Sequence, residues 1–191
     1  NSASEKNRTV VNGMSYSKRD GENANSALVV TVTPKDFDGD SPLAGVEFQR
    51  RMEEKAYELG QGFVPVQTYK DYKDNCPSVK IGNITPQIKG NYKLADLNAI
   101  FPKYINESLK EGIEYFGEKI KGYNDGDVIL SAVESRTSSP VRIIRDENFQ
   151  SNVYGLIPAG EGAGYAGGIT SAAIDGLKIF EYIASKYKPV N

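Results

Sequence analysis

The chain has 191 residues, of which 39% are apolar and 25% charged, enough apolar material for the core of one domain or of one and a fraction. Its 23 basic and 25 acidic residues are evenly mixed and give a net charge of −2, so charge favours neither a nucleic-acid nor a membrane partner. One cysteine and no histidine exclude an intrachain disulfide, a multi-cysteine metal site, and serine–histidine or cysteine–histidine hydrolase chemistry within the chain.

Short strands and turns are expected in the N-terminal part of the chain. The chain begins without methionine, next to a strand expected at residues 9–11, and this start indicates a fragment of a longer protein. Asn12-Gly13 predicts a type I′ turn, because both central positions of that turn need positive φ. Residues 27–33 form a β-branched run of strand length. The acidic residues 36–40 lack the spaced ligands of a calcium loop, so we interpret them as a solvated turn without metal.

The middle of the chain predicts two helices separated by weaker strand signals. Residues 43–59 carry apolar side chains at helical spacing and precede Gly60 and Gly62, which favour a helix end. Residues 63–69 and 79–81 are strand-like, within a region broken by proline and glycine. Helical spacing returns over residues 94–120, with a proline suited to a first-turn position. One buried stripe is expected on this helix, formed by Ile105, Leu109, Ile113, Phe116 and Ile120.

Three short strands and a long helix are expected in the C-terminal third. The strands lie at residues 128–133, 141–144 and 153–159, and the helix at residues 169–185 begins with small residues that allow close packing. Strands and helices alternate without a clean βαβ count, which predicts an α+β fold or part of an α/β fold. No apolar run approaches about 18 residues and no signal-peptide pattern is visible, so we expect a cytoplasmic protein.

A polar loop between two of these strands is the first candidate site. Residues 134–142 place hydroxyls beside two arginines, which provides donors for a phosphate, a carboxylate or a polarised carbonyl. The alternative is a surface loop in which the serines cap the backbone and the arginines pair with Glu134 or Asp146. The sequence leaves both interpretations open. The candidate residues are Arg136, Thr137, Ser138, Ser139 and Pro140.

A glycine run within residues 154–176 is the second candidate site. A short apolar strand leads into five glycines and then into a helix, an arrangement in which backbone N–H groups can approach a ligand. A Walker A loop is rejected, because Gly168 and Ile169 stand where lysine and serine or threonine are required. Residues 162–167 match the letters of a Rossmann G-x-G-x-x-G, but no second strand follows.

The glycine run resembles the late flavin-contacting segment of FAD-dependent oxidoreductases. In that class a strand, a Gly-Glu or Gly-Asp pair and a glycine-rich turn lead into the last helix of the FAD domain. GLIPAGE at residues 155–161, followed by residues 162–176, resembles this pattern. The wider resemblance is to bacterial FAD-dependent dehydrogenases of largely unassigned substrate, and it covers nearly the whole chain. The matching segments are NGMSYSKRD, NANSA, AGVEFQR, ESRTSSPVRI and PAGEGAGYAGGITSAAIDG, in this order.

The resemblance implies a role for each candidate residue. Glu161, paired with Gly160, would bind ribityl or ribose hydroxyls of FAD, and the helix starting near Ile169 would point its positive end at the flavin pyrimidine edge. The polar loop at residues 136–140 would lie near the isoalloxazine ring or the substrate. The backbone N–H groups expected to face the cofactor are those around Gly162, Gly164, Gly167 and Gly168.

The resemblance also implies a domain organisation. Residues 1–25 would return from the FAD domain, residues 26–128 would form an inserted substrate or cap domain, and residues 129–191 would be the C-terminal part of a Rossmann-like FAD-binding domain. No pyrophosphate-binding G-x-G-x-x-G precedes residue 160, so the chain is expected to be only the C-terminal portion.

Several expectations follow for cofactor, partners and activity. FAD is expected in the full-length protein and not in this fragment, which alone should be inactive. The expected partners are the N-terminal FAD-binding half of the same protein and a small-molecule substrate, with NAD(P)H as a further candidate and neither nucleic acid nor membrane. No catalytic acid or base is assigned. The alternative is a stand-alone α+β nucleotide-binding or protein-interaction module without catalysis.

Overall fold

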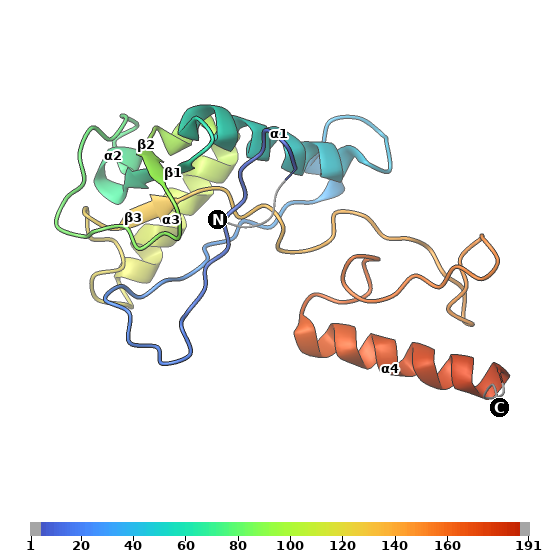
Figure 1. Ribbon diagram of the computed structural model, residues 1–191. Coiled ribbons are helices and arrows are strands. Elements are labelled where there is room, and N and C mark those ends of the chain that lie inside the picture. The colour runs from blue at the N-terminus through green and yellow to red at the C-terminus, as the bar shows by residue number, and fades with distance from the viewer. Residues whose placement is uncertain (1–4, 188–191) are drawn as a thin grey trace. The chain divides into compact units, whose positions relative to one another are not determined.

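A three-stranded sheet and four helices organise the part of the chain that the structure describes (Figure 1). The structure is a computed structural model, and it describes residues 5–187. These residues form a mixed α+β fold in two compact units. Unit 1 comprises the chain up to Asp36 together with Phe48–Ser135, and unit 2 comprises Phe37–Glu47 together with the chain from Arg136 onward.

The sheet of unit 1 has the order β2-β1-β3. The central strand β1 (Val64–Thr68) pairs in parallel with β2 (Tyr92–Leu94) and antiparallel with β3 (Ile129–Ser131). All five residues of β1 are buried, as expected for a central strand that is covered on both faces. β1 and β3 confirm strands expected from the sequence.

The helices of unit 1 follow the predicted apolar spacing. α1 (Ala44–Gly60), which belongs to unit 1 from Phe48 onward, buries Phe48, Met52 and Ala56, one helical turn apart. α2 (Tyr69–Lys73) follows β1 directly. The expected helix at residues 94–120 is divided, because its proline lies at the N-cap of α3 (Lys103–Gly117) and the short 3-10 helix η2 (Leu97–Ala99) precedes it.

The predicted stripe on α3 is buried only in its N-terminal part. Ile105 and Ile113 belong to the core, whereas Phe116 and Ile120 are exposed. Ile120 lies beyond the end of the helix, so the helical spacing no longer orients it. The ring of Phe116 instead lies at the surface in an edge-to-face contact with Tyr115 and a tilted contact with Tyr123, with centroids 5.7 and 5.6 Å apart. The prediction of one continuous buried stripe was wrong at this end.

Other predicted strands and one turn of unit 1 are irregular. Residues 9–11 form single hydrogen bonds, from Thr9 N to Glu53 O and from Val11 N to Val133 O, without a ladder. Asn12-Gly13 forms no type I′ turn, since neither residue has positive φ. Residues 27–33 and 79–81 pair with no strand, and the first run leads into the 3-10 helix η1 (Pro34–Asp36). β-branched residues favour a strand only where a neighbouring strand completes the ladder.

Unit 2 contains one long helix and irregular chain. α4 (Ile169–Lys186) confirms the last predicted helix. The expected strands at residues 141–144 and 153–159 are absent, because among the described residues of this unit no strand runs beside them. Ile143 N donates to Ala163 O at 3.1 Å, a single bond and not a ladder. Of the helices within residues 5–187, none is long and apolar enough to cross a membrane.

Candidate functional site

The two candidate segments lie against one another in unit 2. The hydroxyl of Ser139 in the polar loop lies 3.0 Å from Gly162 O in the glycine run and 2.9 Å from Val141 O in its own loop. The bond between Ile143 and Ala163 adds a second connection. Residues more than twenty positions apart in the sequence therefore form one structure.

Two of the five glycines are required by the backbone of the turn. Gly160 and Gly164 have φ of 66° and 83°, a region that residues with a Cβ rarely occupy. A Cβ on Gly164 would also lie 2.6 Å from Val141 O, so the polar loop approaches the glycine run at van der Waals contact. The turn is closed by bonds from Gly164 N to Glu161 O and from Tyr165 N to Gly160 O, each 2.9 Å long.

A buried ion pair anchors this turn to α4. The guanidinium of Arg145 binds the carboxylate of Asp175 through two bonds of 3.0 and 2.6 Å, and each side chain is only about one-tenth exposed. The same carboxylate accepts the N–H of Gly160 at 2.8 Å, and Arg145 also donates to Pro158 O at 2.7 Å. The pair therefore fixes the start of the glycine turn against the helix.

The electrostatics of this pair are consistent with its geometry. The Arg145 guanidinium, together with the Gly160 N–H, lowers the pKa of Asp175 to about 2 against the desolvation that burial brings. The Asp175 carboxylate in turn raises the pKa of Arg145. Both groups are therefore charged throughout the physiological range.

Tyr165 supports the same arginine from the other side. Its ring centroid lies 3.6 Å from the guanidinium carbon of Arg145 and 4.3 Å from that of Arg142. Its hydroxyl accepts from Arg145 N and donates to Ile143 O, both at 3.1 Å. Sequence reasoning assigned no role to Tyr165, Arg145 or Asp175. The available signal was a lone carboxylate among the small apolar residues that open α4.

The rest of the glycine run is open. A Cβ added to Gly162, Gly167 or Gly168 would meet no atom within 4 Å. The partly buried side chain of Glu161 forms no hydrogen bond or ion pair with any residue that the structure describes. α4 begins after Gly168, which provides no side-chain cap, so its first N–H groups keep their donor capacity. A free carboxylate, open backbone and a helix N-terminus thus lie within nine consecutive residues.

The polar loop places its members differently. Ser139 binds main-chain oxygens, as the surface-loop interpretation expects of its serines, whereas Arg142 stacks on Tyr165. Arg136, Thr137 and Ser138 are exposed. Pro140 packs in unit 2, where a Cβ added to Gly45 would lie 2.9 Å from it. These placements leave the proposed contact with a flavin ring or substrate as a prediction.

The remaining reactive groups do not assemble into a second centre. Among residues 5–187, no three His, Cys, Asp or Glu side chains are grouped so that they could hold a metal ion. Partial burial, with Asp71 and Asp74 nearby, raises the pKa of the Cys76 thiol. A raised thiol pKa lowers the thiolate fraction and with it the nucleophilicity of this cysteine.

Comparison with known proteins places this α+β chain among the C-terminal portions of FAD-dependent proteins. Residues 1–137 match the family described as "FAD-dependent protein, C-terminal domain-like", and the chain belongs to this family. The chain is also similar to an uncharacterized protein of Clostridium beijerinckii, with 52% identity over 188 residues. This alignment covers 97% of the chain but 35% of the relative, so the chain spans about a third of that relative's length. The expected relation to the C-terminal part of an FAD-dependent protein is confirmed.

Proposed function

We propose that this chain is the C-terminal part of an FAD-dependent dehydrogenase and that unit 2 provides a contact with FAD. When bound, the flavin would supply the redox chemistry, taking up two electrons and a proton from a small-molecule substrate as a hydride. NAD(P)H is a further candidate partner. The N-terminal half of the same protein would hold the FAD pyrophosphate. The main support for this proposal is the carboxylate of Glu161, which has no partner among the described residues and lies in a glycine turn with open space around it.

The residues present fit the polyhydroxyl part of such a cofactor. A partly buried carboxylate that lacks a donor loses hydration without compensation. Two neighbouring hydroxyls of a ribityl chain or ribose would each donate to one oxygen of Glu161 and restore these bonds. Gly160 holds this residue in place, because its own N–H is bound to the anchored carboxylate of Asp175.

The open glycines fit a ligand that approaches the backbone closely. The fold of unit 2 has room for side chains at Gly162, Gly167 and Gly168, so it does not itself require glycine there. A bound ligand would occupy this space and would explain why these residues are glycines. The uncapped start of α4 carries partial positive charge that would stabilise negative charge at the edge of a reduced flavin.

Exposed apolar side chains on unit 2 support the proposal that another domain covers this surface. α4 buries Ile179 on one face, while Ile169, Leu177 and Phe180 on another face are 92%, 62% and 64% exposed. A helix that is apolar on more than one face is typical of the interior of a larger protein. Tyr154, 94% exposed, lies in a segment predicted as a strand. The N-terminal half would cover these side chains and provide strands for the unpaired segments.

The role of Glu161 is tested in the longer protein that contains this chain. We expect Glu161→Ala to lower the ratio of flavin to protein after gel filtration, because the hydroxyls of the cofactor lose their acceptor. Glu147→Ala is the matched control, since Glu147 is an exposed carboxylate in the same unit with no side-chain partner among the described residues. Equal flavin retention by the wild type and both variants would contradict the assignment. A colourless wild-type protein that takes up no FAD would instead favour the stand-alone module.

A further inference from the structure

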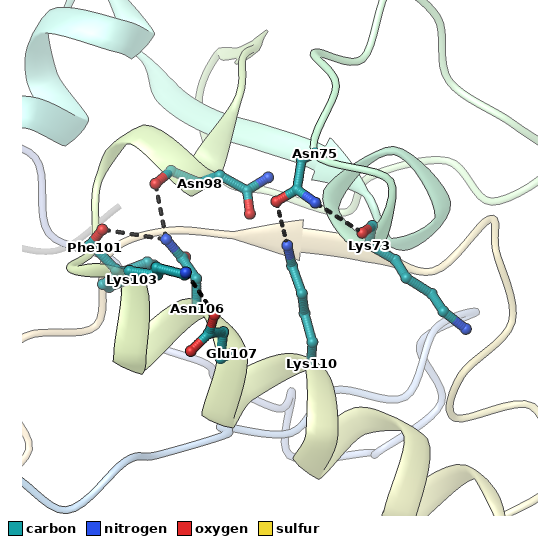
Figure 2. A pocket seen from close by; sticks show the side chains of 8 residues that line it. All are labelled: Lys73, Asn75, Asn98, Phe101, Lys103, Asn106, Glu107 and Lys110. Carbon is teal, nitrogen blue, oxygen red and sulfur yellow. Dashed lines mark hydrogen bonds and ion pairs between the residues drawn. The ribbon is translucent and has the colours of Figure 1, made fainter.

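A pocket of about 560 Å³ lies in unit 1, and none of its lining residues belongs to the proposed flavin site (Figure 2). It lies where the end of α2, the 3-10 helix η2 and the first two turns of α3 meet. This volume is within the range of small-molecule sites in proteins. Its lining combines three lysines, Lys73, Lys103 and Lys110, with one carboxylate, that of Glu107, and with three asparagines and Phe101.

The three lysines differ in their partners. Lys73 pairs with Glu114 at 2.6 Å, and Lys103 lies 3.5 Å from Glu107. Lys110 has no carboxylate partner among the residues that the structure describes, and its ammonium donates to the amide oxygen of Asn75 at 2.7 Å. Partial burial lowers the pKa of Lys110, because its ammonium is incompletely hydrated. The charges of Asp96 and Glu107 oppose this shift, so Lys110 is a cation that has carboxylates nearby but forms no ion pair with one in the described part of the chain.

The same pocket contains an acceptor without a donor. The side-chain oxygen of Asn98 is buried and accepts no hydrogen bond within the described part of the chain. The amide cannot be reversed to satisfy it, because its nitrogen donates to two acceptors, Tyr72 O at 3.1 Å and Asp96 Oδ1 at 2.9 Å. Figure 2 shows the oxygen of Asn98 turned toward the side of the pocket where the Lys110 side chain ends.

Hydrogen bonds connect the side chains around these two groups. Asn106 uses both ends of its amide, donating to Asn98 O and Phe101 O and accepting from the hydroxyl of Tyr72 at 2.7 Å. The Tyr72 ring also lies 4.9 Å from the Lys110 ammonium. These satisfied groups hold the unsatisfied pair in place, as is typical of a preorganised binding site.

We propose that this pocket binds the anionic group of a small molecule, with Lys110 as the counter-ion and Asn98 accepting from a neighbouring hydroxyl or amino group of the same molecule. The anionic group is a carboxylate or a phosphate, the two groups that lysine recognises as a point charge. The proposal does not rest on the flavin contact, since all residues that carry it belong to unit 1.

The test is a titration of the ¹⁵N-labelled 191-residue chain, followed by the amide shifts of Asn98, Asn106 and Lys110. The probes are glycolate, which carries a hydroxyl beside its carboxylate, and inorganic phosphate, with glycerol as the neutral comparison. We expect saturable shifts with a millimolar Kd for at least one anion. Saturable binding of glycolate but not of phosphate would identify a hydroxycarboxylate ligand. Saturable binding of phosphate but not of glycolate would identify a phosphate ester. No saturation by either anion up to 50 mM, or equal binding of glycerol, would overturn the proposal.

Variants of two lysines distinguish binding in the pocket from a general effect of positive charge on the surface. Lys110→Met should weaken binding at least tenfold, and Lys110→Gln, which keeps a donor for Asn75, serves if the first variant does not fold. Lys119→Met is the matched control, because Lys119 is exposed, stacks 4.7 Å from Tyr115 and lies outside the pocket. Equal weakening by the Lys110 and Lys119 variants would also overturn the proposal.

Discussion

Replacement of Asp175 by asparagine should loosen unit 2 and leave unit 1 intact. The change preserves the size of the side chain but removes the charge that binds Arg145. In the wild type the two carboxylate oxygens accept from Arg145 and from Gly160 N, and the asparagine would keep only one of these acceptors. Because both charged side chains are about nine-tenths buried, the remaining guanidinium stays desolvated without its partner.

The size of the effect follows from the pKa of Asp175 and from its burial. The pKa is about 2, against an ordinary value of 3.8. With about 1.4 kcal/mol per pKa unit, the charged form contributes roughly 2 kcal/mol to the free energy of unfolding at neutral pH. Removal of one partner of a buried pair can cost about 3–5 kcal/mol. We therefore expect unit 2 to lose about 2–4 kcal/mol at pH 7.

The pH dependence has a defined sign. Since folding lowers the pKa of Asp175, its contribution is complete above the ordinary value of 3.8 and is lost as the pH falls through about 2. The stability difference between wild type and Asp175→Asn should be constant between about pH 5 and pH 7 and shrink below about pH 4.

The assay is a urea titration of the ¹⁵N-labelled chain, in which amide signals of α4 report on unit 2 and those of β1 on unit 1. Only the α4 transition should move. Glu181→Gln, which changes an exposed carboxylate on the same helix, is the control for charge alone and should have little effect. An α4 transition that is equal in wild type and Asp175→Asn at pH 7 would show that the buried ion pair does not stabilise unit 2.

Two further predictions concern the glycine turn and the exposed face of α4. Gly164→Ala should destabilise unit 2 by about 1–3 kcal/mol in the same urea titration, because its φ is positive and Val141 O lies in the way, whereas Gly162→Ala should be neutral there and lower flavin retention only in the longer protein. The reverse order of stabilities would contradict the geometry. Leu177→Gln should change the stability of the 191-residue chain by less than about 0.5 kcal/mol but lower the Tm of the longer protein, where we propose that this side chain is buried. An unchanged Tm in the longer protein would argue against a covering domain.

The sequence predicted the elements whose signals are local. Helical spacing predicted α1 and α4 close to their observed bounds, but it placed the start of α3 nine residues too early. The run of apolar and β-branched residues around Val64 and Val66 predicted β1. The mixed α+β class follows from these elements. α1, α3 and β1 bury apolar side chains within the described residues, so local preference and tertiary context agree there, whereas α4 leaves Leu177 and Phe180 exposed.

Residues 141–144 and 153–159 have the composition of strands but no neighbour to pair with among the described residues. A strand depends on its partner, and composition cannot reveal whether the partner is present. The prediction of a type I′ turn at Asn12-Gly13 was wrong for a similar reason, because a two-residue turn needs two flanking strands to join.

The sequence drew attention to the glycine run but not to its anchor. It did not distinguish among the five glycines, of which only Gly160 and Gly164 have positive φ. The pairing of Arg145 with Asp175 joins residues 30 positions apart, and no spacing rule connects a loop arginine to a helix carboxylate at that distance. The open surroundings of Gly162 and the unpartnered side chain of Glu161 likewise become visible only in three dimensions.

Whether unit 2 completes an FAD site is tested by the flavin content of the longer protein that contains this chain. The protein would be purified, incubated with FAD, desalted and measured by absorbance near 450 nm together with the 191-residue chain treated in the same way. We expect about one flavin per molecule of the longer protein and none in the shorter chain. A longer protein that stays colourless after incubation would contradict this expectation.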